Sequence, residues 1–138
     1  MGIKKAKTAP VVGAIHKLRE IPTDLVRFSF RHLTFSDKFH LPHDDVGRYV
    51  QTLLERLRDV STMKVFEIKG AGKGLRCHAI DWNGTTEPDG YKHLSPQLQD
   101  CEPRQFSLSA NSYGRVHGIL IDNVFYVVWL DPGHALYR

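Results

Sequence analysis

The sequence predicts an α+β fold, in which an N-terminal strand and a helical hairpin pack on a curved, mainly antiparallel sheet of four to five strands. Three observations predict this class: alternating apolar residues at 26–31, a long amphipathic pattern after residue 45, and three closely spaced strand patterns between residues 106 and 130. With 138 residues, 41% of them hydrophobic and 25% charged, the chain is typical of one folded domain.

The N-terminal segment is polar and basic, and we expect residues 1–12 to form a flexible arm ahead of a single domain at 13–138. Residues 1–20 contain five basic side chains and one acidic side chain, whereas the remaining residues carry 14 of each. The net charge of +4 therefore belongs to this segment, and the body is neutral overall. Lys4, Lys5 and Lys7 are candidate contacts for RNA phosphates, unless they form only a solvated tail.

The first predicted strand is the segment VRFSFR at residues 26–31, where apolar and polar side chains alternate. This period places Arg27 and Arg31 on the solvent-facing side, where both can contact backbone phosphates. A loop with the aromatic residues Phe35 and Phe39 follows. The spacing of apolar residues from Val46 to Val60 then predicts a helix.

Asp44 or Asp45 is expected to cap this helix. Ser61 or Thr62 is expected to cap a second, shorter helix that ends near Gly70. Together the two helices form the predicted helical hairpin.

The second half of the chain is predicted to be mainly strands. Residues 76–82 have a strand pattern, and residues 83–104 form a polar loop in which Ser95-Pro96-Gln97-Leu98 can start a helical turn. A three-stranded meander follows, with strands at 106–110, 115–121 and 124–130 and tight turns at 111–114 and 122–123. The last strand is apolar on both faces, as expected of a central strand.

The predicted hairpin brings two distant polar segments together. If residues 122–123 form a two-residue turn, Ile121 pairs with Val124 and Arg115 pairs with Leu130. Arg115 then lies close to residues 131–134, and His117 faces Val128 with its side chain on the same sheet face as that of Arg115.

These residues suit metal-free cleavage of RNA. Arg115 can neutralise the charge of the transition state, His134 can act as general acid or base, and Tyr137 and His117 can assist. Other interpretations remain open for each. Arg115 can pair with Asp131 on the surface, His134 can cap the chain end, Tyr137 can pack over the sheet, and His117 can be an ordinary core histidine.

The segments SANSYGRVHG at residues 109–118 and GHALY at residues 133–137 resemble the RelE/ParE superfamily of bacterial toxins. The first is similar to a glycine-arginine strand start and the second to a terminal glycine-histidine-tyrosine pattern. Ala135 stands where many family members have arginine, and the loop at 83–104 is longer than that compact fold needs. The His-Tyr tail favours the RelE branch over the gyrase-poisoning ParE branch.

The resemblance implies the toxin of a toxin–antitoxin system, an endoribonuclease that cleaves mRNA, usually on the ribosome, without a metal or other cofactor. Its partner is expected to be an acidic antitoxin protein. The longest apolar run, Val124–Leu130, is far too short to span a membrane, and no secretory signal is visible. We therefore expect a cytoplasmic protein with reduced Cys77 and Cys101.

Two alternatives belong to other functional classes. One is a non-enzymatic domain of the same fold that binds proteins or nucleic acids. The other is a metal-dependent hydrolase built on His40, His43 and Asp44, which a helix start after Pro42 explains equally well.

Overall fold

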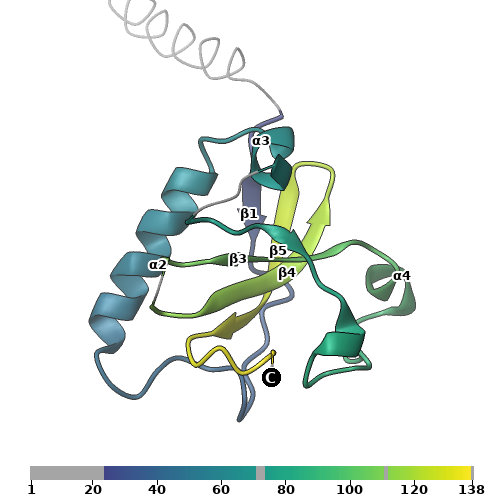
Figure 1. Ribbon diagram of the computed structural model, residues 1–138. Coiled ribbons are helices and arrows are strands. Elements are labelled where there is room, and N and C mark those ends of the chain that lie inside the picture. The colour runs from purple at the N-terminus through teal and green to yellow at the C-terminus, as the bar shows by residue number, and fades with distance from the viewer. Residues whose placement is uncertain (1–23, 71–73, 111, 138) are drawn as a thin grey trace, which may run out of the picture.

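The computed structural model describes residues 24–70, 74–110 and 112–137, and it confirms the α+β class (Figure 1). Lys4, Lys5 and Lys7 of the expected arm lie outside the described residues. The five strands lie in the order β1-β5-β4-β3-β2, and β1 is parallel to β5 while the other neighbours are antiparallel. The strands are β1 (Arg27–Ser29), β2 (His78–Ala79), β3 (Pro103–Ser107), β4 (Arg115–Ile121) and β5 (Val124–Asp131).

The long predicted helix is present as α2 (Val46–Val60). Tyr49, Leu53, Leu57 and Val60 of its apolar stripe are buried in the core, as the spacing predicts, whereas Val46 and Leu54 are exposed. Asp45 precedes the helix with a left-handed backbone (φ 55°), and its side chain makes no capping hydrogen bond. The Asp45 carboxylate lies 3.5 Å from Nε of Arg48 instead, so only the position of the predicted cap is confirmed.

The second helix, α3 (Val65–Gly70), is shorter than predicted, and Ser61 and Thr62 do not cap it. Their hydroxyls donate to the carbonyls of Arg58 and Asp59 at the end of α2, both at 2.6 Å. Glu67 accepts a hydrogen bond from the backbone of Lys64 instead (3.0 Å), which satisfies a donor at the start of α3.

β1 is shorter than its predicted range of 26–31, β5 extends one residue further than predicted, and β2 and β3 differ more. β2 contains two residues because Arg76 adopts φ 49°, outside the strand region, and the chain enters the 3₁₀ turn η1 (Trp82–Gly84) soon afterwards. β3 begins at Pro103 and ends at Ser107, since the backbone beyond it turns at Ser109, whose hydroxyl donates to the carbonyl of Ser112 (2.8 Å). The predicted helical turn in the long loop is confirmed as α4 (Pro96–Gln99).

The sheet is covered on both faces, which explains why β5 is apolar on both. Figure 1 shows α2 and α4 on opposite sides of the sheet. One apolar cluster joins α2 and α3 to the sheet, and we call this side the helix face. The other joins the sheet to Phe39, the segment 80–101 and the tail 132–137, and we call it the tail face.

The β4–β5 hairpin follows the predicted register only along its first part. Ile121 pairs with Val124 as predicted, but a bulge between His117 and Gly118 shifts the rest by one residue. Arg115 therefore pairs with Asp131 rather than Leu130, and His117 pairs with Trp129 rather than Val128.

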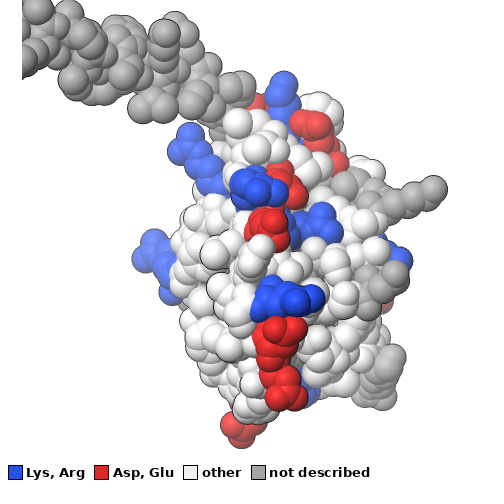
Figure 2. All heavy atoms as spheres, turned by 90° about the vertical axis from the view of Figure 1, so that its left-hand side faces the viewer, with Lys and Arg blue, Asp and Glu red and all other residues white. Residues whose placement is uncertain are grey.

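The described part of the surface on the α2 side carries charges of both signs (Figure 2). Figure 2 shows Lys and Arg interspersed with Asp and Glu on this side. One such pair is Arg58–Asp59, at 2.9 Å. Within the described ranges, no helix combines the length and the hydropathy that crossing a bilayer requires.

Candidate functional site

A pocket of about 330 Å³ lies where the end of β5 meets the start of β4. Its lining includes Arg115 and His134, so the structure brings together two of the four predicted catalytic residues. It also includes Tyr113 and Gly114 of the turn before β4, Arg76 of the segment before β2, and Gly133 of the tail after β5.

Arg115 is half-buried and does not form the surface ion pair with Asp131 that we considered as an alternative. Its Nη1 donates to the carbonyl of Gly114 (3.3 Å), and its buried Nε has no partner among the described residues. Burial, together with the nearby Arg76, lowers the pKa of Arg115, while Asp131 and Tyr137 oppose this shift. Two guanidinium groups thus face one pocket, which suits an anion.

Arg76 is a pocket residue that the sequence reasoning missed. It lies between a glycine-rich segment and a predicted strand, and no spacing links it to Arg115. Arg56 of α2 fixes the backbone near Arg76. Its Nε donates to the carbonyl of Leu108 (2.9 Å), and its Nη2 donates to that of Gly74 (3.4 Å). One side chain therefore ties together two segments that lead into the pocket.

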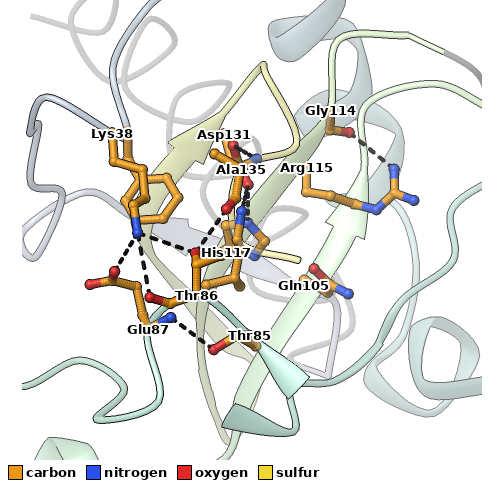
Figure 3. A network of polar contacts seen from close by, with 12 residues as sticks. Lys38, Thr85, Thr86, Glu87, Gln105, Gly114, Arg115, His117, Asp131 and Ala135 are labelled. Atoms are coloured by element: carbon orange, nitrogen blue, oxygen red, sulfur yellow. Dashed lines mark hydrogen bonds and ion pairs between the residues drawn. The ribbon is translucent and has the colours of Figure 1, made fainter. Parts of the chain in front are cut away.

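The tail after β5 is folded around the carboxylate of Asp131 (Figure 3). Oδ1 accepts a hydrogen bond from the backbone of Ala135 (2.7 Å), and Oδ2 accepts one from that of Leu136 (3.0 Å). Burial would raise the pKa of Asp131, but the hydrogen bonds from His117 and from these two amides bring it below its usual value. An ionised Asp131 thus fixes the path of residues 132–136.

His117 completes this arrangement from β4. Its Nε2 lies 3.0 Å from Oδ2 of Asp131, and its side chain is fully buried. Burial lowers the pKa of His117 despite the carboxylate, so the ring is neutral at pH 7 and carries its proton on Nε2. The expectation that His117 assists at the reacting atoms is therefore corrected: this ring cannot touch an RNA strand and acts by positioning the tail.

His134 is exposed at the pocket edge, where its own backbone takes φ 55° and its N–H donates to the carbonyl of Asp131 (3.2 Å). Its ring lies 6.4 Å from that of Tyr137, measured between centroids. Tyr137 is half-buried outside the pocket lining and bridges to Thr85. Burial and then Asp81 raise the pKa of Tyr137, which keeps its hydroxyl protonated at neutral pH.

Gly114 explains the glycine in the quoted glycine-arginine segment. Its φ is +68°, which favours glycine, and a Cβ atom here would lie 1.9 Å from the carbonyl oxygen of Asp131. The absence of a side chain thus allows the turn before Arg115 to touch the end of β5.

The two arginines of the first strand lie away from this pocket. Arg27 pairs with Val124, at the opposite end of β5 from Asp131. The two ends are roughly 20 Å apart at about 3.3 Å per residue. Arg31 is exposed in the segment that follows β1 and is not part of the pocket lining. Neither residue joins the Arg115–His134 pocket.

The alternative metal site is not assembled. The rings of His40 and His43 lie 5.0 Å apart, but Nδ1 of His40 contacts the carbonyl of Leu41 (2.6 Å). Among the residues that the structure describes, no three His, Cys, Asp or Glu side chains meet in a metal-binding arrangement.

We compared the chain with protein-family models, with curated proteins and with solved structures, and none of the three comparisons gave a match. The functional argument therefore depends on the pocket itself and on the sequence motifs.

Proposed function

We propose that this protein is a RelE-like toxin, a metal-independent endoribonuclease that cleaves mRNA at the Arg115–His134 pocket. The observation that carries the proposal is the meeting of a half-buried arginine, a second arginine and an exposed histidine at one pocket. The residues come from three separate segments of the chain.

The proposed reaction needs no group beyond the RNA and the protein. The 2′-oxygen attacks the neighbouring phosphorus, the bond to the 5′-oxygen breaks, and the products are a 2′,3′-cyclic phosphate and a 5′-hydroxyl. His134 accepts the proton of the 2′-hydroxyl, because its exposed imidazole lies at the pocket edge and imidazole is the commonest general base in enzymes. Arg115 and Arg76 stabilise the negative charge of the pentavalent phosphorane. The hydroxyl of Tyr137, which burial keeps protonated, is the candidate donor to the 5′-oxygen.

In the cell, we propose that the protein works in the cytoplasm, on mRNA that is either free or bound to the ribosome, and is inhibited by an acidic antitoxin protein. The neutral body supports a small, local RNA contact rather than a broad basic surface. Finding a short reading frame for an acidic protein beside this one would support the antitoxin.

The test is induction in bacteria, with growth and primer extension on a reporter mRNA as readouts. Arg115→Ala should reduce cleavage about 100- to 1,000-fold, as expected for loss of one transition-state contact. Arg115→Lys keeps the charge but loses the two-pronged geometry, so it should restore only part of the activity. His134→Ala should reduce cleavage about 100-fold or more.

Matched controls are available on surfaces away from the pocket. Arg58→Ala and His43→Ala replace exposed residues of the same types and should leave cleavage unchanged. Full growth inhibition by both Arg115→Ala and His134→Ala would exclude this site.

A non-enzymatic anion-binding domain is the second candidate, and one observation favours it. In the described part of the chain, the ring of His134 contacts Tyr137 but forms no hydrogen bond that would orient it for proton transfer. This candidate predicts RNA binding that depends on Arg115, with no cleavage under any translation condition.

A further inference from the structure

A second pocket, of about 250 Å³, lies on the tail face near the end of β5. Its lining includes Trp129 and Phe39, with Lys38, Glu87, Lys92 and His93 around them. In Figure 3, Lys38 and Glu87 lie on one side of Asp131 and Ala135, and Arg115 lies on the other. The folded tail therefore separates the two pockets.

The apolar part of this pocket is a stack of flat rings. The rings of Phe39 and Trp129 are 4.4 Å apart and inclined by only 16°. The ring of His93 lies 5.8 Å from that of Trp129, inclined by 21°. Burial, and then the nearby His32, lower the pKa of His93, so its ring is neutral at pH 7. Neutral imidazole can stack on an aromatic ring system without a charge to solvate.

The local sequence holds these rings in place. Ser36 and Phe39 close a tight turn, in which the backbone of Ser36 donates to the carbonyl of Phe39 (2.9 Å) and Oγ of Ser36 accepts from the backbone of Phe39 (3.1 Å). On β5, the bulge leaves both Val128 and Trp129 on the tail face. Phe39 and Trp129 are buried in the folded core, and the exposed ring of His93, stacked on Trp129, forms the outer surface of this platform.

The rim of the pocket is cationic. Lys38 forms an ion pair with Glu87 and also donates to Oγ1 of Thr86 (3.2 Å). Lys92 is exposed and forms no ion pair within the described residues. An aromatic platform beside an unpaired lysine is the combination that proteins use for single-stranded nucleic acid, with bases stacked on rings and phosphates near cations.

We infer that this second pocket binds one unstacked nucleobase of single-stranded RNA, next to the phosphate that Arg115 holds. The inference rests on the proposed function and adds a base-binding subsite to it. The volume is below the usual range of about 300–1,000 Å³ for drug-sized ligands, which suits one flat ring system. Trp129 precedes Asp131 by two residues, about 7 Å along a strand, so one short RNA segment can reach both pockets.

The test uses the fluorescence of Trp129. The chain has two tryptophans, so Trp82→Phe leaves Trp129 as the single reporter. Five-residue oligoribonucleotides of adenine or uracil should quench this fluorescence saturably, whereas an abasic oligomer of the same length should not. If Trp82→Phe does not fold, the same titration is made with the unmodified chain.

A substitution series links the signal to this pocket. His93→Ala should weaken oligonucleotide binding about tenfold, within the range for loss of one stacking contact. Lys92→Ala should weaken it less, and mainly at low salt. His43→Ala is the matched control, an exposed histidine outside this pocket lining, and should bind normally.

The outcomes separate this inference from the proposed function. Equal quenching by the abasic oligomer, or unchanged affinity in His93→Ala, would overturn the base-binding subsite. Base-dependent quenching by a protein that never cleaves RNA would reject only the nuclease. Arg115→Ala should reduce cleavage about 100- to 1,000-fold and weaken affinity, but base-dependent quenching should persist at saturation.

Discussion

The two faces of the sheet are both buried, but they are built from different kinds of residue. The buried cluster of the helix face is made mainly of apolar side chains, such as Phe106, Val116, Phe125 and Leu130, and it also contains the hydroxyl of Tyr49, which has no partner among the described residues. The tail face combines Ile119 and Trp129 with buried polar side chains. These polar side chains are Gln105, Ser107, His117 and Asp131. His117 is hydrogen-bonded to Asp131, and Asp131 accepts hydrogen bonds from the tail, whereas Oγ of Ser107 and Oε1 of Gln105 are buried without a partner among the described residues. A buried polar group costs free energy unless it is hydrogen-bonded, and of these four side chains the His117–Asp131 pair combines hydrogen-bonded polar groups with the positioning of another segment.

The comparison teaches that stability and positioning are divided between the faces. Apolar contacts on the helix face are non-directional and tolerate small shifts. The hydrogen bonds of Asp131 on the tail face are directional and specify where residues 134–136 lie. Substitutions on the helix face should therefore lower the free energy of unfolding, whereas substitutions on the tail face should also change the local protection of residues 134–136.

The sharpest test compares Asp131→Ala with Leu130→Ala, adjacent residues whose side chains lie on opposite faces. Asp131→Ala should lower the free energy of unfolding by about 3–5 kcal/mol, since it leaves His117 and two amides without their acceptor. Leu130→Ala should lower it by about 2–5 kcal/mol through a cavity. Urea denaturation measures both values.

Amide hydrogen exchange distinguishes the two variants. Asp131→Ala should lose protection at Ala135 and Leu136 well beyond its global destabilisation, whereas Leu130→Ala should lose protection in proportion to it. Equal and uniform losses in both variants would show that the two faces do not differ in function.

The second prediction concerns pH. The pKa of His117 is lowered in the folded state, so the unfolded chain binds more protons below about pH 6.5. The contribution of neutral His117 is therefore fully present above that pH and is lost as pH falls, by at most about 1.4 kcal/mol per pH unit. The lowered pKa of Asp131 adds a further loss only below about pH 3.8.

His117→Gln isolates this effect, because glutamine can still donate to Asp131 but does not titrate. Thermal denaturation between pH 5 and 8 should show a smaller decline on acidification in the variant than in the parent. A parallel decline in both proteins would assign the acid sensitivity to other groups.

The smallest expected effect is at Thr86, which holds the tail from its outer side. Its hydroxyl donates to the carbonyl of Ala135 (2.8 Å), and its backbone donates to that of Leu136 (2.7 Å). Thr86→Val replaces the hydroxyl by a methyl group, which removes the bond to Ala135 and the exposed contact from Lys38, so it should cost about 0.5–1.5 kcal/mol in urea denaturation.

Thr52→Val on the exposed side of α2 is the matched control. Its hydroxyl donates to the carbonyl of Arg48 (2.9 Å), a contact within the helix, and its loss should change stability by less than about 0.5 kcal/mol. A larger effect at Thr52 than at Thr86 would contradict the idea that the tail is held by specific polar contacts.

Periodic features of the sequence predicted most of the fold. The helix at 46–60 and the turn at 122–123 follow from local spacing and turn chemistry, and the structure contains both. The cap residues of α3 were mispredicted because the hydroxyls of Ser61 and Thr62 can either accept from the backbone N–H groups of the following helix or donate to the carbonyls of the preceding one. The geometry of the turn after α2 decides between the two.

The candidate site was predicted in part. Hairpin register placed Arg115 near His134, because the turn at residues 122–123 fixes which residues of the two paired strands lie opposite each other. The same pairing rule failed at His117, since a single extra residue in β5 cannot be seen in a run that is apolar throughout. Arg76 was missed for a different reason. Its position at the pocket depends on its own positive φ and on the hydrogen bond from Arg56 to Gly74, and neither feature leaves a periodic signal in the sequence.

The bulge in the hairpin also has a mechanical meaning. β5 has eight residues and β4 has seven, so two strands joined edge to edge differ in contour length. A two-stranded ribbon in which one strand has an extra residue must bend at the position of that residue. Gly118 is the point of bending, since any side chain there would meet the carbonyl of Tyr126 at 2.2 Å. Deleting Val128 should therefore straighten the ribbon and re-aim the arginine at its start while leaving the rest of the sheet paired.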